Sequence, residues 1–382
     1  AKSEKNANVL MISCDILSVD GKMARIAKKE ISKRLPISPK NIMISATHTH
    51  HGPDYRGLFV PGGSLALIKG FLFPDPETEE LFTLARKLIK VAISAHENRK
   101  DAKMGVTQTH VPEKERVMIN RRDPFNGKAD YPITVIKFIK QRENSLLGFI
   151  VNYACHGTVL PRSNTLITAD YVGYLIQALE EREPEAEFVY FNGPCGEINP
   201  LTSELRYKMI LKGEGGLTAR DIYNQEGTWK DGERIGKIIA THAYKASKNI
   251  ECKEEIDIRV FQVPIHVPIR DYPYGNDFMA VLNKTLYKLK ITLFSSLTKL
   301  GVLKNNIFFR TDELLAKKSV KSVLQLIVID DCLILTVPGE YFLKLAMEVI
   351  DYAKDNFPAK KTFMIELAND SIGYLYTLQA YL

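Results

Sequence analysis

Short apolar runs alternate along the chain with longer stretches in which apolar residues recur every three or four positions. The first pattern predicts strands and the second predicts amphipathic helices. The predicted strands are residues 9–14, 41–47, 133–139, 146–154, 188–191, 256–268, 323–329, 332–337 and 361–367. The predicted helices are residues 22–35, 75–95, 171–182, 231–248 and 341–353. Because strands and helices alternate, we expect an α/β fold with a mixed β-sheet core and helices packed on its faces.

The connections between these elements predict a single large domain over residues 1–382. The first strand, helix and strand form a unit that implies a right-handed parallel crossover. Polar turns at residues 142–145 and 330–331 predict two hairpins within the sheet. We expect residues 201–230 to form a loop and residues 269–322 to form a polar insertion of loops and helix within the domain.

Composition excludes some classes of protein. The formal charge is +7, and no long run of Lys and Arg is interleaved with aromatics, so we expect no nucleic-acid partner. No apolar run approaches the roughly 20 residues of a membrane span. The five scattered cysteines are typical of reduced, packed thiols, which favours the cytoplasm. Localisation stays open, because the chain begins at Ala1 and its N-terminus is incomplete on this interpretation.

Polar residues with chemical potential follow several predicted strands. His48, His50 and His51 come directly after the second strand, and His156 follows the strand that ends at Ala154. Three further strands lead into the segments "NGPCGEINP" with Cys195, "VPGE" with Glu340, and "ANDSIGY" with Tyr374. Ligands of α/β sheets bind outside the carboxyl ends of strands, so we expect one common site.

The residue types favour zinc, which prefers imidazole and carboxylate ligands. Side chains alternate along an extended chain, so His48 and His50 should face one site and His51 the other side. Parallel neighbours cannot easily both ligate one tetrahedral ion, which predicts one ligand and one catalytic partner.

Structural alternatives remain open at this point. The His-Thr-His segment is equally consistent with a hydrogen-bonded pair, and His156 with a packed core histidine. Glu340 precedes a helix, where a carboxylate interacts with the helix dipole. Tyr374 on its own is an ordinary aromatic. The remaining histidines lack clustered partners and are interpreted as solvated or structural: His96, His110, His242 and His266.

Taken together, seven segments resemble the neutral/alkaline non-lysosomal ceramidases and their shorter prokaryotic relatives. They occur in the order of that family and span most of the chain. The segments are "SATHTHHGPD" (45–54), "INRRDP" (119–124), "NYACHGT" (152–158), "LITADYVGY" (166–174), "FNGPCGEINP" (191–200), "VPGE" (337–340) and "LANDSIGYL" (367–375).

The resemblance implies a role for each matching residue. The zinc ligands would be His48, His156, Glu340 and Tyr374, while His50 and Arg121 would belong to the catalytic surroundings. The strand ends had singled out four of these six residues. Arg121 comes from the resemblance alone, and Tyr374 carries no signal of its own.

The chain departs from the family pattern in two ways. Gly193 stands where ceramidases have a serine with a catalytic role, so a covalent serine step is not available there. Cys195 lies two residues further on and is interpreted as structural rather than nucleophilic, because no base partner is evident. The second departure is that the chain lacks the family's opening segment and its immunoglobulin-like C-terminal domain. We therefore expect a piece truncated at both ends.

These features predict a zinc-dependent hydrolase of an amide (N-acyl) bond that uses metal-activated water. His50 would be the general base and Arg121 would stabilise the oxyanion. The substrate would be a small-molecule or lipid amide such as ceramide, or a different amide, ester or glycan-linked compound. Leucines and lysines at residues 282–300 form a stripe that either packs on the sheet or contacts a membrane peripherally. The alternative function is a metal-binding family member that acts on a non-ceramide substrate or only binds it. The oligomeric state is not predicted.

Overall fold

The computed structural model describes residues 7–53, 77–122, 129–213, 216–268, 319–357 and 359–377. Contacts divide the chain into two compact units. The first comprises residues 1–53, 85–263 and 324–382, and the second comprises residues 54–84 and 264–323. Most of the predicted insertion at 269–322, including the 282–300 stripe, lies outside the described residues, and the single-domain assignment stays a prediction.

One four-stranded sheet has the order β3-β5-β6-β7. Antiparallel pairing joins β3 to β5 and β5 to β6, and the second of these pairs is the predicted hairpin. Strands β6 and β7 run parallel. The strands are β3 (Ala102–Thr109), β5 (Ile133–Lys140), β6 (Leu146–Tyr153) and β7 (Glu187–Asn192).

A second four-stranded sheet has the order β13-β11-β10-β9 and is also mixed, because β10 and β11 are antiparallel while β11 and β13 are parallel. Three two-stranded pairs complete the described strands: parallel β1–β2, parallel β12–β14 and antiparallel β4–β8. The bounds are β1 (Leu10–Cys14), β2 (Ile42–Ala46), β4 (Met118–Asn120), β8 (Ile198–Pro200), β9 (Ile258–Pro268), β10 (Ser319–Ile329), β11 (Cys332–Thr336), β12 (Glu340–Tyr341), β13 (Lys361–Ile365) and β14 (Tyr374–Leu375).

Five of the described helices, α1, α4, α5, α6 and α7, begin at polar caps. Asp20 accepts a hydrogen bond from the Met23 amide at the start of α1, and Thr228 with Asp231 forms a capping box on α7. The bounds are α1 (Gly21–Ser32), α3 (Glu77–Glu97), α4 (Tyr171–Glu180), α5 (Ser203–Lys212), α6 (Ala219–Tyr223), α7 (Trp229–Ser247), α10 (Leu343–Asn356) and the short 3₁₀ turns η1 (Pro39–Asn41) and η3 (Glu113–Glu115).

The predicted loop over residues 201–230 is wrong. Two helices, α5 and α6, occupy half of this stretch, and α7 begins before it ends. Only Leu205 is fully buried along α5, while Tyr207, Ile210 and Leu211 are exposed. The helix therefore lacks the apolar stripe from which amphipathic helices are recognised.

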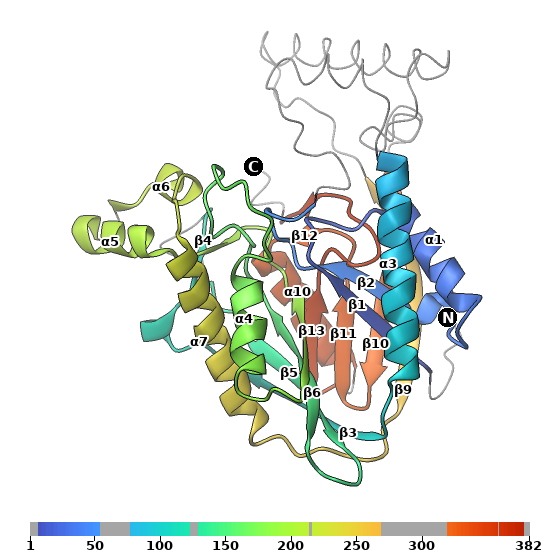
Figure 1. The fold of residues 1–382 in the computed structure, drawn as a ribbon. Helices are drawn as coiled ribbons and strands as arrows, with labels where there is room; N and C mark the ends of the chain where they lie inside the picture. Colours follow the sequence, from blue (N-terminus) through green and yellow to red (C-terminus); the bar gives the residue numbers. More distant parts are fainter. Residues whose placement is uncertain are drawn as a thin grey trace, which may run out of the picture. The chain divides into compact units, whose positions relative to one another are not determined.

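Alternating side chains of the sheets belong to two apolar clusters. Along β5, Val135 packs in the cluster shared with α4, α7 and α10, whereas Ile136 packs in a cluster with residues of β2, β7, β11 and β13. Helices α4 and α7 lie side by side, with α7 against β3 and β5 and α4 against β7 (Figure 1). The predicted α/β class with mixed sheets and packed helices is confirmed.

The structure also bears on the cysteines and on helices that could span a membrane. All five cysteines are free thiols, and four of them are buried. Within the described residues, no helix combines the length and the apolar character required to cross a bilayer.

Candidate metal centre

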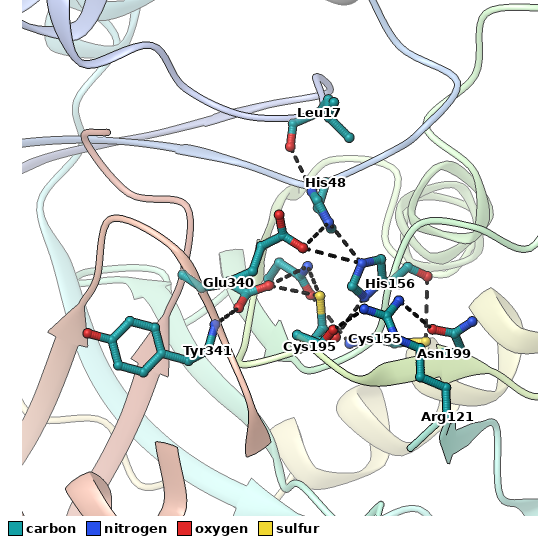
Figure 2. A network of polar contacts seen from close by, with 12 residues as sticks. Leu17, His48, Arg121, Cys155, His156, Cys195, Asn199, Glu340 and Tyr341 are labelled. Atoms are coloured by element: carbon teal, nitrogen blue, oxygen red, sulfur yellow. Dashed lines mark hydrogen bonds and ion pairs between the residues drawn. The ribbon is translucent and has the colours of Figure 1, made fainter. Parts of the chain in front are cut away.

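Three of the predicted ligands meet at the carboxyl ends of strands. His48 lies two residues beyond β2, His156 three residues beyond β6, and Glu340 four residues beyond β11. The Nε2 atoms of His48 and His156 are 3.1 Å apart. The Glu340 Oε2 atom lies 3.3 Å from the first Nε2 and 3.5 Å from the second. Figure 2 shows the three side chains converging on one point from different segments.

A close backbone approach brings the two histidine segments together. Thr49 and Gly157 form a parallel β-bridge, and the His50 amide donates to the Gly157 carbonyl. A Cβ atom at position 157 would lie 2.7 Å from the His48 carbonyl oxygen. Only glycine fits there, so the contact between the segments depends on Gly157.

The chain is not extended at His48, where φ is +66°. The alternation used to assign the directions of these side chains therefore does not hold at this residue. The left-handed conformation is uncommon for histidine. His48 and His50 nevertheless lie close together, with ring centroids 4.9 Å apart.

Hydrogen bonds fix the tautomer of both buried imidazoles. The Nδ1 atom of His48 lies 2.7 Å from the Leu17 carbonyl, and that of His156 lies 2.6 Å from the Cys195 carbonyl. A carbonyl oxygen only accepts, so each Nδ1 carries the hydrogen. In its neutral form each ring presents an Nε2 lone pair toward the other ring and toward Glu340. Three acceptors therefore face one point in a buried site.

The pKa values reflect this crowding. Burial and the neighbouring His48 lower the pKa of His156 to about 4. Burial lowers the pKa of His50 well below its usual value, and the adjacent imidazoles act in the same direction. Burial opposes ionisation of Glu340, but the two histidines hold its pKa well below the usual range. Burial by itself lowers the pKa of His48, but the Glu340 carboxylate outweighs burial and raises that pKa above its ordinary value.

His50 and His51 occupy different surroundings. One ring nitrogen from each of His48, His50 and His156 lies within 4.8 Å of the other two, so the three histidines form a group that could hold a metal ion. The His51 ring instead contacts the Leu160 carbonyl at 3.2 Å and the Asn164 side chain at 3.2 Å. This separates His51 from the other two histidines of the motif.

Tyr374 and Arg121 complete the set of predicted site residues. Tyr374 pairs with Glu340 in the β12–β14 register, and its side chain is hydrogen-bonded to both Glu340 and Arg121. Partial desolvation of its hydroxyl and the Glu340 carboxylate raise the pKa of Tyr374, although the residue as a whole is 45% exposed. The Arg121 guanidinium lies 5.6 Å from the centre of the Tyr374 ring and donates to the Gly196 carbonyl and the Asn199 side chain. All six residues therefore gather in one place, while their roles stay predictions.

Gly193, which stands where the ceramidases have a serine, is packed too closely for a larger side chain. A Cβ atom at Gly193 would lie 2.9 Å from the Tyr131 ring and 3.2 Å from the Ala154 amide nitrogen. Cys195 is fully buried, and burial raises its thiol pKa well above the usual value. Its carbonyl is the acceptor for His156, which agrees with a structural role.

Two participants carried no signal in the motifs. The Leu17 carbonyl orients His48, and a backbone group cannot be recognised from residue type. Glu366 is fully buried and accepts from the Cys195 thiol at 2.8 Å. The sequence did place Glu366 within the apolar strand predicted at 361–367, and a buried carboxylate needs hydrogen-bond partners. That position was the signal by which Glu366 could have been found.

Comparisons with known proteins agree with the resemblance drawn from the motifs. A family model described as "Neutral/alkaline non-lysosomal ceramidase, N-terminal" matches residues 1–195, which is half of the chain. Neutral ceramidases of Drosophila pseudoobscura pseudoobscura and Drosophila melanogaster are each 31% identical over 204 residues. That match covers 47% of this chain and 26% of each relative.

Two solved structures share the fold. One, described as "Ceramidase complexed with C2", superposes with a TM-score of 0.67 at 16% identity and covers 98% of this chain and 62% of its own. The neutral ceramidase of Pseudomonas aeruginosa gives 0.64 at 15% identity, covering 97% of this chain and 61% of its own. The present chain thus spans about a quarter of the curated relatives and under two thirds of these structures. By its family match, the chain belongs to the neutral/alkaline non-lysosomal ceramidase family.

Proposed function

We propose that this chain is a zinc-dependent hydrolase of an amide (N-acyl) bond. The observation that carries the proposal is the convergence of two imidazole lone pairs and one carboxylate oxygen in a buried site. When both rings are neutral, the three acceptors cannot satisfy one another, and a cation at their centre would complete the arrangement. His48 and His156 are 2% and 1% exposed, which leaves little water to screen them.

The spacing of the acceptors fits zinc. Ligand atoms 2.0–2.2 Å from a tetrahedral ion lie about 3.3–3.6 Å apart. The observed separations of 3.1, 3.3 and 3.5 Å are close to that range. The Nδ1 hydrogen bonds to backbone carbonyls are also the usual support of metal-bound histidines. His48, His156 and Glu340 would hold the ion, with Tyr374 as the fourth ligand.

The remaining residues supply binding and proton transfer. Bound zinc provides a Lewis acid that activates water and polarises a carbonyl group. His50, beside His48 and His156, would accept the proton of the attacking water and return it to the leaving amine. Arg121 is held by two acceptors beside Tyr374 and would stabilise negative charge that develops on the carbonyl oxygen.

The proposed substrate class is a lipid amide of the ceramide type. This rests on the family and on the names of the relatives, which are ceramidases. A water mechanism needs no covalent serine, so the closed packing around Gly193 is compatible with hydrolysis.

The same packing favours a second candidate function. If the family reaction depends on the serine, this chain would bind a metal and a ligand without turning it over. The presence of His50 and Arg121 beside the cluster speaks against that loss, because neither is needed to hold the ion.

The test combines metal analysis with an assay on fluorogenic N-acyl substrates of short and long chain. We expect about one zinc per protein, hydrolysis that a chelator abolishes, and recovery when zinc is added back. Zinc without hydrolysis of any amide would support the binding function. A purified protein that does not take up zinc at micromolar concentrations would overturn the proposed metal centre.

A further inference from the structure

Glu366 is a fully buried acidic side chain beneath the histidine cluster that the proposed reaction does not use. It follows β13 directly, and its backbone is fixed on both sides. The Glu366 amide donates to the Asn192 carbonyl at 3.1 Å, and its carbonyl accepts from the Ser45 hydroxyl at 2.9 Å. Its position is therefore set by β7 and β2, the strands that lead into Cys195 and His48.

One carboxylate oxygen of Glu366 reaches the segment that orients His156. Oε1 accepts from the Cys195 thiol at 2.8 Å and from the Asn192 side-chain amide at 3.4 Å. The carbonyl of the same cysteine accepts the Nδ1 hydrogen of His156 at 2.6 Å. Glu366 is thus two contacts away from an imidazole that faces the centre of the cluster.

The other oxygen reaches the segment that carries Glu340. Oε2 accepts from the backbone amide of Tyr341, the residue directly after Glu340, at 3.1 Å. The Tyr341 carbonyl in turn accepts from the Gly196 amide at 2.9 Å. A single carboxylate therefore joins the loop after β7 to β12.

We infer that Glu366 is a positioning residue for the metal centre, which sets the separation of His156 from Glu340 by bridging Cys195 and Tyr341. This inference rests on the proposed function, since it concerns the same centre. Residues that orient metal ligands typically change metal affinity by about 10- to 100-fold when they are replaced. A residue that served stability alone would not change it.

The substitution Glu366→Gln tests the bridge with almost no change in shape. The backbone N–H of Tyr341 and the side-chain NH2 group of Asn192 can only donate, and they face different oxygens of Glu366. A glutamine offers one acceptor and one amino group, so one of these donors would face another donor. We expect the bridge to open on that side.

Asp231→Asn is the matched control. Asp231 is a buried carboxylate, 3% exposed, that also joins two segments through its two oxygens. One oxygen accepts from the Ser203 amide at 2.8 Å and the other from the Thr228 amide at 3.0 Å. Both contacts lie at the starts of α5 and α7, so this variant measures the loss of one buried acceptor away from the cluster.

The experiment titrates zinc alone, in competition with a chromophoric chelator, into metal-free wild type, Glu366→Gln and Asp231→Asn, with thermal unfolding measured in parallel. We expect both variants to unfold earlier, Glu366→Gln to bind zinc about 10- to 100-fold more weakly, and Asp231→Asn to bind within twofold of wild type. Wild-type affinity in Glu366→Gln, together with a lowered melting temperature, would overturn the inference.

A second variant covers the case in which Glu366→Gln does not fold. Cys195→Ala removes one donor to Glu366 but keeps the Cys195 carbonyl, and we expect a several-fold loss of zinc affinity. Unchanged affinity in Cys195→Ala would overturn the link through Cys195. Absence of zinc binding in the wild type would instead contradict the proposed metal centre, so the two failures are distinguishable.

Discussion

Two histidine–carboxylate contacts in the molecule have similar distances but different surroundings. His242 Nε2 lies 2.8 Å from Glu115 Oε2, whereas His48 Nε2 lies 3.3 Å from Glu340 Oε2. Glu115 is partly exposed, whereas the His242 side chain is only 13% exposed, so this pair is partly buried. The contact at the cluster is longer, yet it is buried and shared with a second imidazole. Distance alone therefore does not distinguish a metal centre from a single histidine–carboxylate pair.

The cluster differs from this pair in that two imidazoles face one carboxylate oxygen. In the cluster, both Nδ1 atoms are bound to carbonyls, so both Nε2 atoms present lone pairs to the same carboxylate oxygen. Such an arrangement needs positive charge at its centre, supplied by a metal ion or by a proton on His48, whose pKa the Glu340 carboxylate holds above its ordinary value. The predictions below test that distinction.

The largest expected effect is the contrast between His156→Ala and His242→Ala. We expect His156→Ala to lose zinc and all hydrolysis, and to lose stability because metal binding also stabilises the fold. His242→Ala should keep zinc and activity, with a loss of about 1 kcal/mol in unfolding free energy, because the ring is partly buried. Metal analysis and denaturant unfolding of both variants check this. Equal zinc contents in the two variants would remove the distinction.

A smaller effect is expected where the two histidine segments touch. Gly157→Ala places a Cβ 2.7 Å from the His48 carbonyl oxygen and 2.8 Å from the Thr49 Cα. Both are backbone atoms, so the segments must separate, at a cost of about 1–3 kcal/mol in stability and with weaker zinc binding.

Gly173→Ala in α4 is the control for that variant. Its Cβ would meet only the Ala169 side chain, at 3.5 Å, an ordinary contact. Alanine in a helix should raise stability by about 0.5–1 kcal/mol and leave zinc binding unchanged. If Gly157→Ala behaved like Gly173→Ala in both measurements, the close approach would not matter for the centre.

A third prediction concerns a buried charge outside the cluster. Burial lowers the pKa of Lys28, which is 7% exposed in α1, from 10.5 to about 7. Below pH 7 both the folded and unfolded states carry the proton, and the penalty for burying the charge is complete. Between pH 7 and 10.5 the unfolded state binds more protons, so stability rises with pH.

Lys28→Met should remove this dependence. We expect it to raise the unfolding free energy by a few kcal/mol at pH 6, on the order of the 1.36 kcal/mol that each pKa unit represents. The advantage should shrink toward zero by about pH 10. Denaturant unfolding at several pH values measures it, and an advantage that does not vary with pH would show that the lysine is not buried as a charged group.

Hydrophobic patterning predicted the elements that have one clearly buried face. The expected strands at 9–14 and 41–47 correspond to β1 and β2, and the two expected hairpins formed. It missed β3, which lies at an edge of its sheet with mostly half-buried side chains, and α5, which buries little. Weak burial leaves weak patterning, so both elements depend on tertiary contacts that one sequence does not display.

The site residues also divide into those that the sequence predicted and those that it did not. His48, His156 and Glu340 were recognisable because each follows an apolar strand, and strand ends gather in this fold class. Arg121 and Tyr374 were placed only by resemblance to a family. The carbonyls of Leu17 and Cys195, and the carboxylate of Glu366, depend on how separate segments pack, and residue type alone did not reveal them.

The most direct test of the central claim is the zinc content of purified His48→Ala and His50→Ala. Removal of a ligand should strip the metal, whereas removal of a general base should leave it in place and lower turnover by about 10²- to 10⁴-fold. We predict that His48→Ala is metal-free and that His50→Ala retains close to one zinc per protein. A metal-free His50→Ala beside a zinc-loaded His48→Ala would exchange the two roles. Full zinc and full turnover in both would contradict the metal centre proposed here.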